Sequence, residues 1–328
     1  MVMIQATFMA LLLASAEGAA ARGSSHATLL LQMPAELLDA AGGSYPDAEG
    51  LVGHNRGGFK AAALQRGAML KLAIAAARGD KKRADDCWRA IDVTFQRQHG
   101  EGHFGDPPAS VAFWLCELNR TLLVVRQSPL ADHYEARMNA LLPKIRKASE
   151  WLATKKETLF KEDGHAPNRL FFDACAFGFA GILLGDEGLT TTGREFLARG
   201  MRLFRDEDGA FLERGGGDSS YQAVCLLRLQ EWVLHFPDAR TEAAIDRGMQ
   251  WELGKIGPDG TITTEGNTRV RPGGEKFMGN EKQVNVGEVC LALLYYHART
   301  GDAASLDAAR RIYDRHRRGP VPPDVRRK

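Results

Sequence analysis

Several features are missing from this chain, and each absence excludes a class of protein. No apolar run reaches the roughly 18 to 20 residues that a membrane-spanning helix needs, so we expect no membrane partner. Strand-like alternation is almost absent, and only residues 261–266 (TITTEG) suit a short hairpin arm. With 44% hydrophobic and 26% charged residues, the composition is that of a globular protein with a sizeable core.

Disulfide and metal patterns are missing as well. The chain has five cysteines, an odd number, and no CxxC or Cys/His spacing. Four of them lie in apolar helical segments, where a free cysteine is a common small core residue. We therefore expect the cysteines to pack in the core, and we predict no metal and no other cofactor.

The chain also lacks a strong charge of either sign. Its formal net charge is +2 over 328 residues, and local clustering of charge decides more than this total. We predict no nucleic-acid partner.

The two ends of the chain differ in character from the rest. Residues 8–16 (FMALLLASA) resemble the apolar core of a signal peptide, but nothing before them is positively charged, so a fraying amphipathic helix is the alternative. If residues 1–25 are a cleaved signal, we expect a periplasmic or secreted protein; otherwise we expect a cytoplasmic one. Residues 317–328 are basic and proline-rich, which predicts disorder. No linker divides residues 26–316, which we assign to one domain.

A block that recurs four times is the main feature of this domain. Each copy has a polar, glycine-containing loop and then an apolar helical segment with a cysteine at a fixed offset, eight residues after the copies' first residues Pro108, Pro167, Gly217 and Lys282. The four cysteines are Cys116, Cys175, Cys225 and Cys290. Repeats of this size indicate an array that buries its core between neighbouring units.

Two kinds of helix alternate along the repeats. The cysteine-bearing segments are apolar nearly all round and should be buried, whereas the helices that begin near residues 80, 130, 188, 238 and 302 have a charged face and should lie outside. This alternation predicts an all-α fold, an α/α toroid of about five to six helix pairs, complete or one pair short. A right-handed α-solenoid is the alternative.

In such a toroid the polar loops share one end of like-oriented helices, which we call the rim. Its predicted residues are polar or basic, namely His54, Asn55, Arg56, His103, His165, Asn168, Arg169, Arg214, Asp218, Tyr221, Lys282, Gln283 and Asn285. The long loop before the last repeat adds Asn267, Arg269, Arg271 and Lys276. Helix N-termini surrounded by such side chains suit carboxylate or sulfate groups, which points to an acidic polysaccharide or oligosaccharide. The alternative is that Asn, Asp and Ser cap helices and the arginines are solvated; for Asp218 alone we favour the cap.

Part of the rim resembles a known family. Asn168, then Arg214 in ERGGGDSSYQ, then Tyr221 seven residues later, is similar to the arrangement in alginate-lyase-like polysaccharide lyases of the α/α-toroid superfamily. The likeness covers residues 165–232. Arg169 stands where those lyases carry a histidine, and the nearest histidine, His165, comes three residues before Asn168. The resemblance implies a lyase that cleaves a uronate-containing glycan by β-elimination.

The chemistry of β-elimination assigns roles to these residues. Asn168 with Arg169 or Arg214 can neutralise the uronate carboxylate and so acidify the neighbouring proton. Tyr221 is a candidate base or acid, with a phenol pKa lowered by nearby arginine, and His165 is the competing base. Tyr221 packing as a helix-start aromatic is the structural alternative.

Two other functions stay open. One is a toroid hydrolase similar to the unsaturated glucuronyl hydrolases, which uses two carboxylates as acid and base. Its candidate carboxylates are Asp163, Asp173, Asp208, Glu213 and Asp218, although the Asp208 sequence DEDGAF is first of all a turn signal. The other is a toroid that binds a glycan or a protein without catalysis.

Overall fold

The computed structural model describes residues 25–277 and 279–317, so the predicted signal segment up to residue 24 and the tail from residue 318 lie outside it. The predicted all-α fold is confirmed. Five inner helices follow one another along the chain: α5 (Met69–Ala77), α7 (Pro108–Arg126), α10 (Pro167–Leu184), α12 (Ser219–Val233) and α14 (Val286–Thr300). Each is followed by an outer helix that packs against it: α6 (Lys81–Phe95), α8 (Ala131–Ala153), α11 (Glu187–Met201), α13 (Ala239–Leu253) and α15 (Ala303–Arg317).

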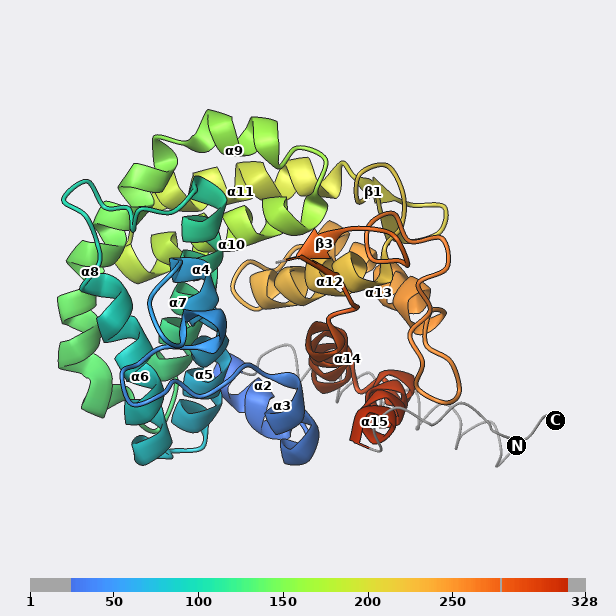
Figure 1. Ribbon diagram of the computed structural model, residues 1–328, viewed down its shortest axis with the longest axis horizontal. Coiled ribbons are helices and arrows are strands. Elements are labelled where there is room, and N and C mark those ends of the chain that lie inside the picture. Colours follow the sequence, from blue (N-terminus) through green and yellow to red (C-terminus); the bar gives the residue numbers. More distant parts are fainter. Residues whose placement is uncertain (1–24, 278, 318–328) are drawn as a thin grey trace, which may run out of the picture.

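A short N-terminal helix pair closes the ring. Helix α2 (His26–Gln32) packs against α5 and α14, and α3 (Ala35–Ala41) packs against α14 and α15. In Figure 1 the chain runs from α2 and α3 through α6 and α8, past α9 and α11, and round to α12, α13, α14 and α15. The toroid is therefore complete, and its first pair is shorter than the rest.

Short elements fill the loops at the rim. They are the helical turns η1 (Gly53–Asn55), α4 (Ala62–Gln65), η2 (Arg66–Ala68) and α9 (Lys156–Glu162), and two antiparallel ribbons, β1 (Phe204–Arg205) with β2 (Ala210–Phe211) and β3 (Lys276–Phe277) with β4 (Asn280–Glu281). The predicted hairpin arm at residues 261–266 makes an isolated bridge instead, between Ile256 and Ile262.

The inner helices form the core because their sequences are apolar on nearly every side. In α12 every residue is buried, and in α10 all but three are. All five cysteines are buried free thiols, which confirms the prediction that they fill the core. The outer helices bury one face only, and Asp80, Asp186 and Asp238 cap the N-termini of three of them.

Helices α10 and α11 approach each other closely because glycines face one another. A Cβ added to Gly193 of α11 would lie 2.7 Å from the backbone nitrogen of Gly178 in α10, and one added to Gly200 would lie 2.4 Å from the ring of Phe171. Only glycine permits this spacing, so the inner helix α10 and the outer helix α11 pack closely here.

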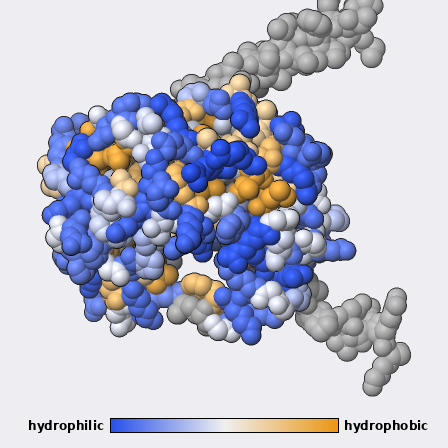
Figure 2. Space-filling view, turned by 90° about the horizontal axis from the view of Figure 1, so that it is seen from above, coloured by the Kyte–Doolittle hydropathy of each residue, from blue (hydrophilic) through white to orange (hydrophobic). Residues whose placement is uncertain are grey.

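The outer surface is mainly hydrophilic, with smaller apolar areas between the charged side chains (Figure 2). Within the described residues, no helix is both long and apolar enough to cross a membrane.

Candidate functional site: the rim and the axial cavity

Two hydrogen bonds bring the predicted rim together. The backbone N–H of Arg214, before α12, donates to the carbonyl oxygen of His165, before α10, at 2.8 Å. The N–H of Asn285, which caps α14, donates to the Ser220 hydroxyl at the start of α12 at 3.0 Å. The N-terminal ends of α10, α12 and α14 therefore lie side by side.

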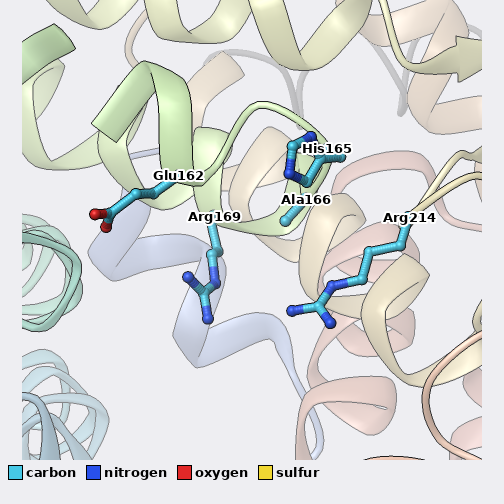
Figure 3. Close-up of a pocket in the computed structure, with 5 residues that line it drawn as sticks. All are labelled: Glu162, His165, Ala166, Arg169 and Arg214. Carbon is cyan, nitrogen blue, oxygen red and sulfur yellow. The ribbon is translucent and has the colours of Figure 1, made fainter. Parts of the chain in front are cut away.

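Three of the predicted site residues line one pocket of about 410 Å³: His165, Arg169 and Arg214, together with Glu162 and Ala166. In Figure 3 the guanidinium groups of Arg169 and Arg214 extend toward the same space, whereas the Glu162 carboxylate points away from them. We call this the cationic pocket. Arg169 is fixed by Asp163, whose carboxylate is fully buried and accepts a hydrogen bond from Arg169 Nη1 at 2.9 Å.

Tyr221 lies in a different network at the same rim. Its hydroxyl donates to Glu275 Oε2 at 2.7 Å and accepts from Lys282 Nζ, and the Arg269 guanidinium stacks 3.9 Å from its ring centroid. Burial raises the pKa of Tyr221, and the hydrogen bond to Glu275 adds to this rise. The prediction of a lowered phenol pKa is therefore wrong: Arg269 lies close by, but burial outweighs its charge.

Arg269 links this network to a second buried carboxylate. It donates to both oxygens of Glu275, at 3.1 and 2.7 Å, and forms an ion pair with Glu213. Burial raises the pKa of Glu213 to about 7 against the opposing effect of Arg269. At Glu275, burial is outweighed by the hydrogen bonds from Arg269 and Tyr221, which hold its pKa at about 2.

Asn168 does not share this network. It is buried in the first turn of α10, and its side-chain oxygen has no hydrogen-bond partner within the described residues. The Tyr221 hydroxyl is directed to Glu275 and Lys282 instead. The arrangement that the lyase resemblance implies, with Asn168 and Tyr221 bonded around one sugar, is therefore not present as a direct contact.

Two predicted substrate-binding residues have structural roles. Asp218 caps α12 and accepts from the backbone N–H groups of Ser220, Tyr221, Arg269 and Val270. Asn55 is completely buried, and its amide bonds three neighbouring residues of the same loop, Lys60, Ala61 and Gln65.

The remaining predicted residues border the rim more loosely. Exposed side chains are those of His54, Arg56, Arg271 and Lys276. The His54 ring lies 6.0 Å from Phe277, so η1 meets the β3–β4 ribbon. His103 stacks on His99 with 4.4 Å between ring centroids.

A second cavity, of about 260 Å³, lies on the axis of the toroid between α5, α7, α12 and α14. It reaches from Asn285, at the N-terminal end of α14, to Tyr295, roughly two to three turns further along that helix. We call it the axial cavity. Its charged lining residues are Arg66, Glu117, Arg120, Arg228, Glu231 and Glu288.

Four of these residues form a closed ion-pair quartet between α7 and α12. Arg228 Nη1 lies 2.6 Å from Glu117 Oε1 and 2.9 Å from Glu231 Oε2. Arg120 lies 2.8 Å from Glu117 and 3.1 Å from Glu231. Each carboxylate thus meets both arginines, which fixes the two carboxylates at the bottom of the cavity.

Burial and pairing push the pKa values of the two carboxylates apart. At Glu117, burial is outweighed by Arg228 and Arg120, and the pKa falls to about 2. At Glu231, burial prevails over the same arginines and raises the pKa to about 7. The surroundings therefore favour the protonated form more at Glu231 than at Glu117, a difference that acid–base catalysis can use.

Arg66 and Glu288 also line the axial cavity and carry opposite charges. The Arg66 guanidinium lies 5.2 and 5.3 Å from the ring centroids of Phe113 and Phe172, and burial raises the pKa of Glu288. Glu288 is also within electrostatic reach of Lys282, so the cavity and the Tyr221 network are neighbours.

The axial residues were missed in the sequence, although a signal exists. Glu117, Arg120, Arg228 and Glu231 are charged residues inside the apolar segments FWLCELNRTLL and VCLLRLQEWVL. A charge in a helix that is buried on all sides must be paired or functional. The carboxylates that were predicted for a hydrolase lie elsewhere: Asp208 is in the β1–β2 turn paired with Arg205, and Asp173 is fully buried with neither oxygen bonded. Within the described residues, no three His, Cys, Asp or Glu side chains are grouped to hold a metal ion.

Neither protein-family models nor curated proteins match this chain. Solved structures do. An Asp-to-Asn variant of the unsaturated glucuronyl hydrolase of Streptococcus agalactiae aligns with 90% of this chain and 76% of its own, at 12% identity and a TM-score of 0.53. A UGL variant with dGlcA-Glc-Rha-Glc covers 90% and 84%, at 13% identity and a TM-score of 0.56. A second S. agalactiae variant, complexed with dGlcA-GalNAc6S, covers 90% and 82%, at 10% identity and a TM-score of 0.54. At these identities the likeness establishes the fold, an α/α toroid.

Proposed function

We propose that this protein is a glycan-processing enzyme, a hydrolase that releases a terminal unsaturated glucuronyl residue from an acidic oligosaccharide. The observation that carries the proposal is that two carboxyl groups, Glu117 and Glu231, line the axial cavity and are held there by the same two arginines. A cavity of about 260 Å³ is slightly smaller than the usual ligand pocket, a size that suits one sugar ring at the end of a chain.

The two carboxyl groups would divide the reaction between them. Glu231, whose pKa is raised by burial, would donate its proton to the sugar during bond cleavage. Glu117, ionised, accepts a proton from the attacking water, as the base of a carboxylate pair does. Arg120 and Arg228 hold both groups in place, and Arg228 lies 4.9 Å from the Phe172 ring, so it cannot easily swing away.

The neighbouring structures support the substrate class. Their names are those of unsaturated glucuronyl hydrolases, and two of them hold saccharides that begin with dGlcA. In this chain Arg66, which lines the axial cavity, and Lys282, beside it, are cations suited to a uronate carboxylate.

The lyase interpretation is supported less well. A phenol needs a lowered pKa to remove a proton near neutral pH, and burial raises that of Tyr221. Its hydroxyl is also occupied by Glu275 and Lys282.

One optical assay separates the three functions. A lyase creates a conjugated double bond in the uronate and raises the ultraviolet absorbance of a polymer solution. A hydrolase that acts on unsaturated oligosaccharides frees the sugar, whose enol ether then opens to a keto acid, and the absorbance falls. We expect no change with intact uronate polymers and a fall with unsaturated glucuronyl disaccharides. A rise with polymers would instead establish the lyase, and no change with any substrate would leave a binding protein.

A further inference from the structure

The cationic pocket lies outside the axial cavity, and the proposed reaction does not use it. Three of its five lining residues can carry positive charge, and Glu162, its one acidic residue, points away (Figure 3). A pocket with this positive charge suits neither an apolar nor a cationic ligand.

Arg214 occupies an unusual backbone conformation at this pocket. Its φ is +53°, and within the described residues it is the only non-glycine residue with a positive φ. It sits in a tight turn in which Glu213 and Gly216 pair and Gly215 also has a positive φ of 92°. Glycine, asparagine or aspartate normally fill such a position, because another side chain strains the backbone there.

The surrounding contacts hold this conformation. The Arg214 N–H donates to His165 at 2.8 Å, and the Glu213 N–H donates to the Gly216 carbonyl at 2.8 Å. The Arg214 side chain is exposed and has no hydrogen bond or ion pair within residues 25–277 and 279–317, so no polar contact in this part of the protein explains the arginine. An arginine kept in a strained turn, with its guanidinium directed at a pocket, indicates a ligand for that guanidinium.

Arg169 supplies a second, better fixed cation. Its Nη1 is held by the buried Asp163, which leaves Nε and Nη2 without a partner in the described part of the chain. Since Asp163 balances one of the two guanidinium charges, the pocket keeps the charge of Arg214.

We propose that the cationic pocket binds an oxyanion, a sulfate ester or a carboxylate, carried by a sugar of the oligosaccharide. The claim that this oxyanion belongs to the substrate rests on the proposed function. The claim that the pocket binds an oxyanion does not. The pocket would then select chains with a second acidic group beyond the sugar held in the axial cavity. Guanidinium groups suit this ligand because they donate two parallel hydrogen bonds to its oxygens.

Inorganic sulfate tests the pocket without any turnover. The thermal midpoint of the full chain is measured against sodium sulfate, with sodium chloride at the same ionic strength as the reference. The thermal midpoint of the wild-type protein should rise with sulfate and then saturate, in addition to the general stabilising effect of sulfate as a salt. Arg214→Gly relieves the turn, so it should fold at least as well and yet lose the saturable part. Arg202→Gln, which changes an exposed arginine at the C-cap of α11, is the matched control and should keep it. The same curve for all three proteins would overturn the proposal.

Oligosaccharides then identify the anion. Binding of unsaturated disaccharides with and without a sulfate ester is compared in wild type and Arg214→Gly by calorimetry. Loss of a charged hydrogen-bond partner should weaken binding about ten- to a hundred-fold. If only the sulfated ligand is affected, the pocket binds a sulfate ester; if both are, it binds a carboxylate. If Arg214→Gly binds both as tightly as wild type does, the pocket is no part of the substrate site. The absorbance assay is scored separately, so either proposal can fail alone.

Discussion

Burial raises the pKa of both Tyr221 and Glu231, but the consequences differ because their surroundings differ. The Tyr221 hydroxyl is bonded to Glu275 and Lys282, which makes it part of the bracing between α12 and the loop before α14. Glu231 lines a cavity and shares its arginines with Glu117, so its proton can reach a ligand.

Tyr221→Phe separates bracing from catalysis. The substitution keeps the ring under Arg269 and removes the hydroxyl, so Glu275 and Lys282 each lose a partner. We expect the free energy of unfolding to fall by about 1 to 3 kcal/mol, as for hydrogen bonds to charged groups, with turnover unchanged. Chemical denaturation and steady-state rates check this. A hundred-fold loss of turnover in a folded variant would restore the lyase interpretation.

Asp173 predicts a dependence of stability on pH. It is completely buried, neither oxygen is bonded within the described residues, and burial raises its pKa well above the usual range. Above about pH 4 the unfolded chain releases this proton while the folded protein retains it, so the folded state becomes less stable as pH rises.

Asp173→Asn should remove that loss. Asparagine fills nearly the same volume and does not ionise, so the variant should gain stability over wild type as the pH rises from 4 to 7, by at least about 1 kcal/mol. Thermal midpoints of both proteins across this range provide the measurement. A constant difference would mean that the Asp173 proton is not retained on folding.

Among the elements, the inner helices followed most directly from the sequence. A helix that is apolar on all sides can only be buried, and the repeated cysteine marked four such helices. The helix predicted to begin near residue 130 is α8, which ends at Ala153, and a separate short helix, α9, begins at Lys156.

The cysteines test the role of the inner helices. Cys225 is completely buried, and burial raises the pKa of its thiol, so it should be inert toward thiol reagents in the folded protein. Cys225→Ala should cost on the order of 1 kcal/mol of stability through the small volume lost, with full activity. Denaturation curves and reagent titration check both statements. Loss of turnover without unfolding would assign the thiol a functional role.

At the scale of the whole molecule, the sequence predicted the toroid better than the site. Alternating helix types specify the ring, and the likeness of the loops predicted that His165, Arg169 and Arg214 would come together. The charges inside the apolar segments of α7 and α12 are a signal for buried pairs, but the cavity itself could not be predicted, because Glu117 and Glu231 become neighbours only through the packing of these helices across a closed ring. The number of residues between Glu117 and Glu231 in the sequence does not indicate that they meet. Ring closure itself depends on α2 and α3, which belong to no cysteine repeat.

The central claim is that the carboxyl groups of the axial cavity carry out hydrolysis. Glu231→Gln keeps the shape of the side chain but removes its ability to donate or accept a proton as an acid or base. The matched control is Glu252→Gln on α13, since Glu252 is equally buried, has a raised pKa and does not line the cavity.

The measurement is the rate of absorbance loss when an unsaturated glucuronyl disaccharide is added to wild type and to both variants, each first shown to be folded by its thermal transition. We expect wild type and Glu252→Gln to remove the absorbance at similar rates, and Glu231→Gln to be slower by a factor of about a hundred or more, as for a lost proton donor. Equal rates in Glu231→Gln and wild type would contradict the assignment of catalysis to the axial cavity.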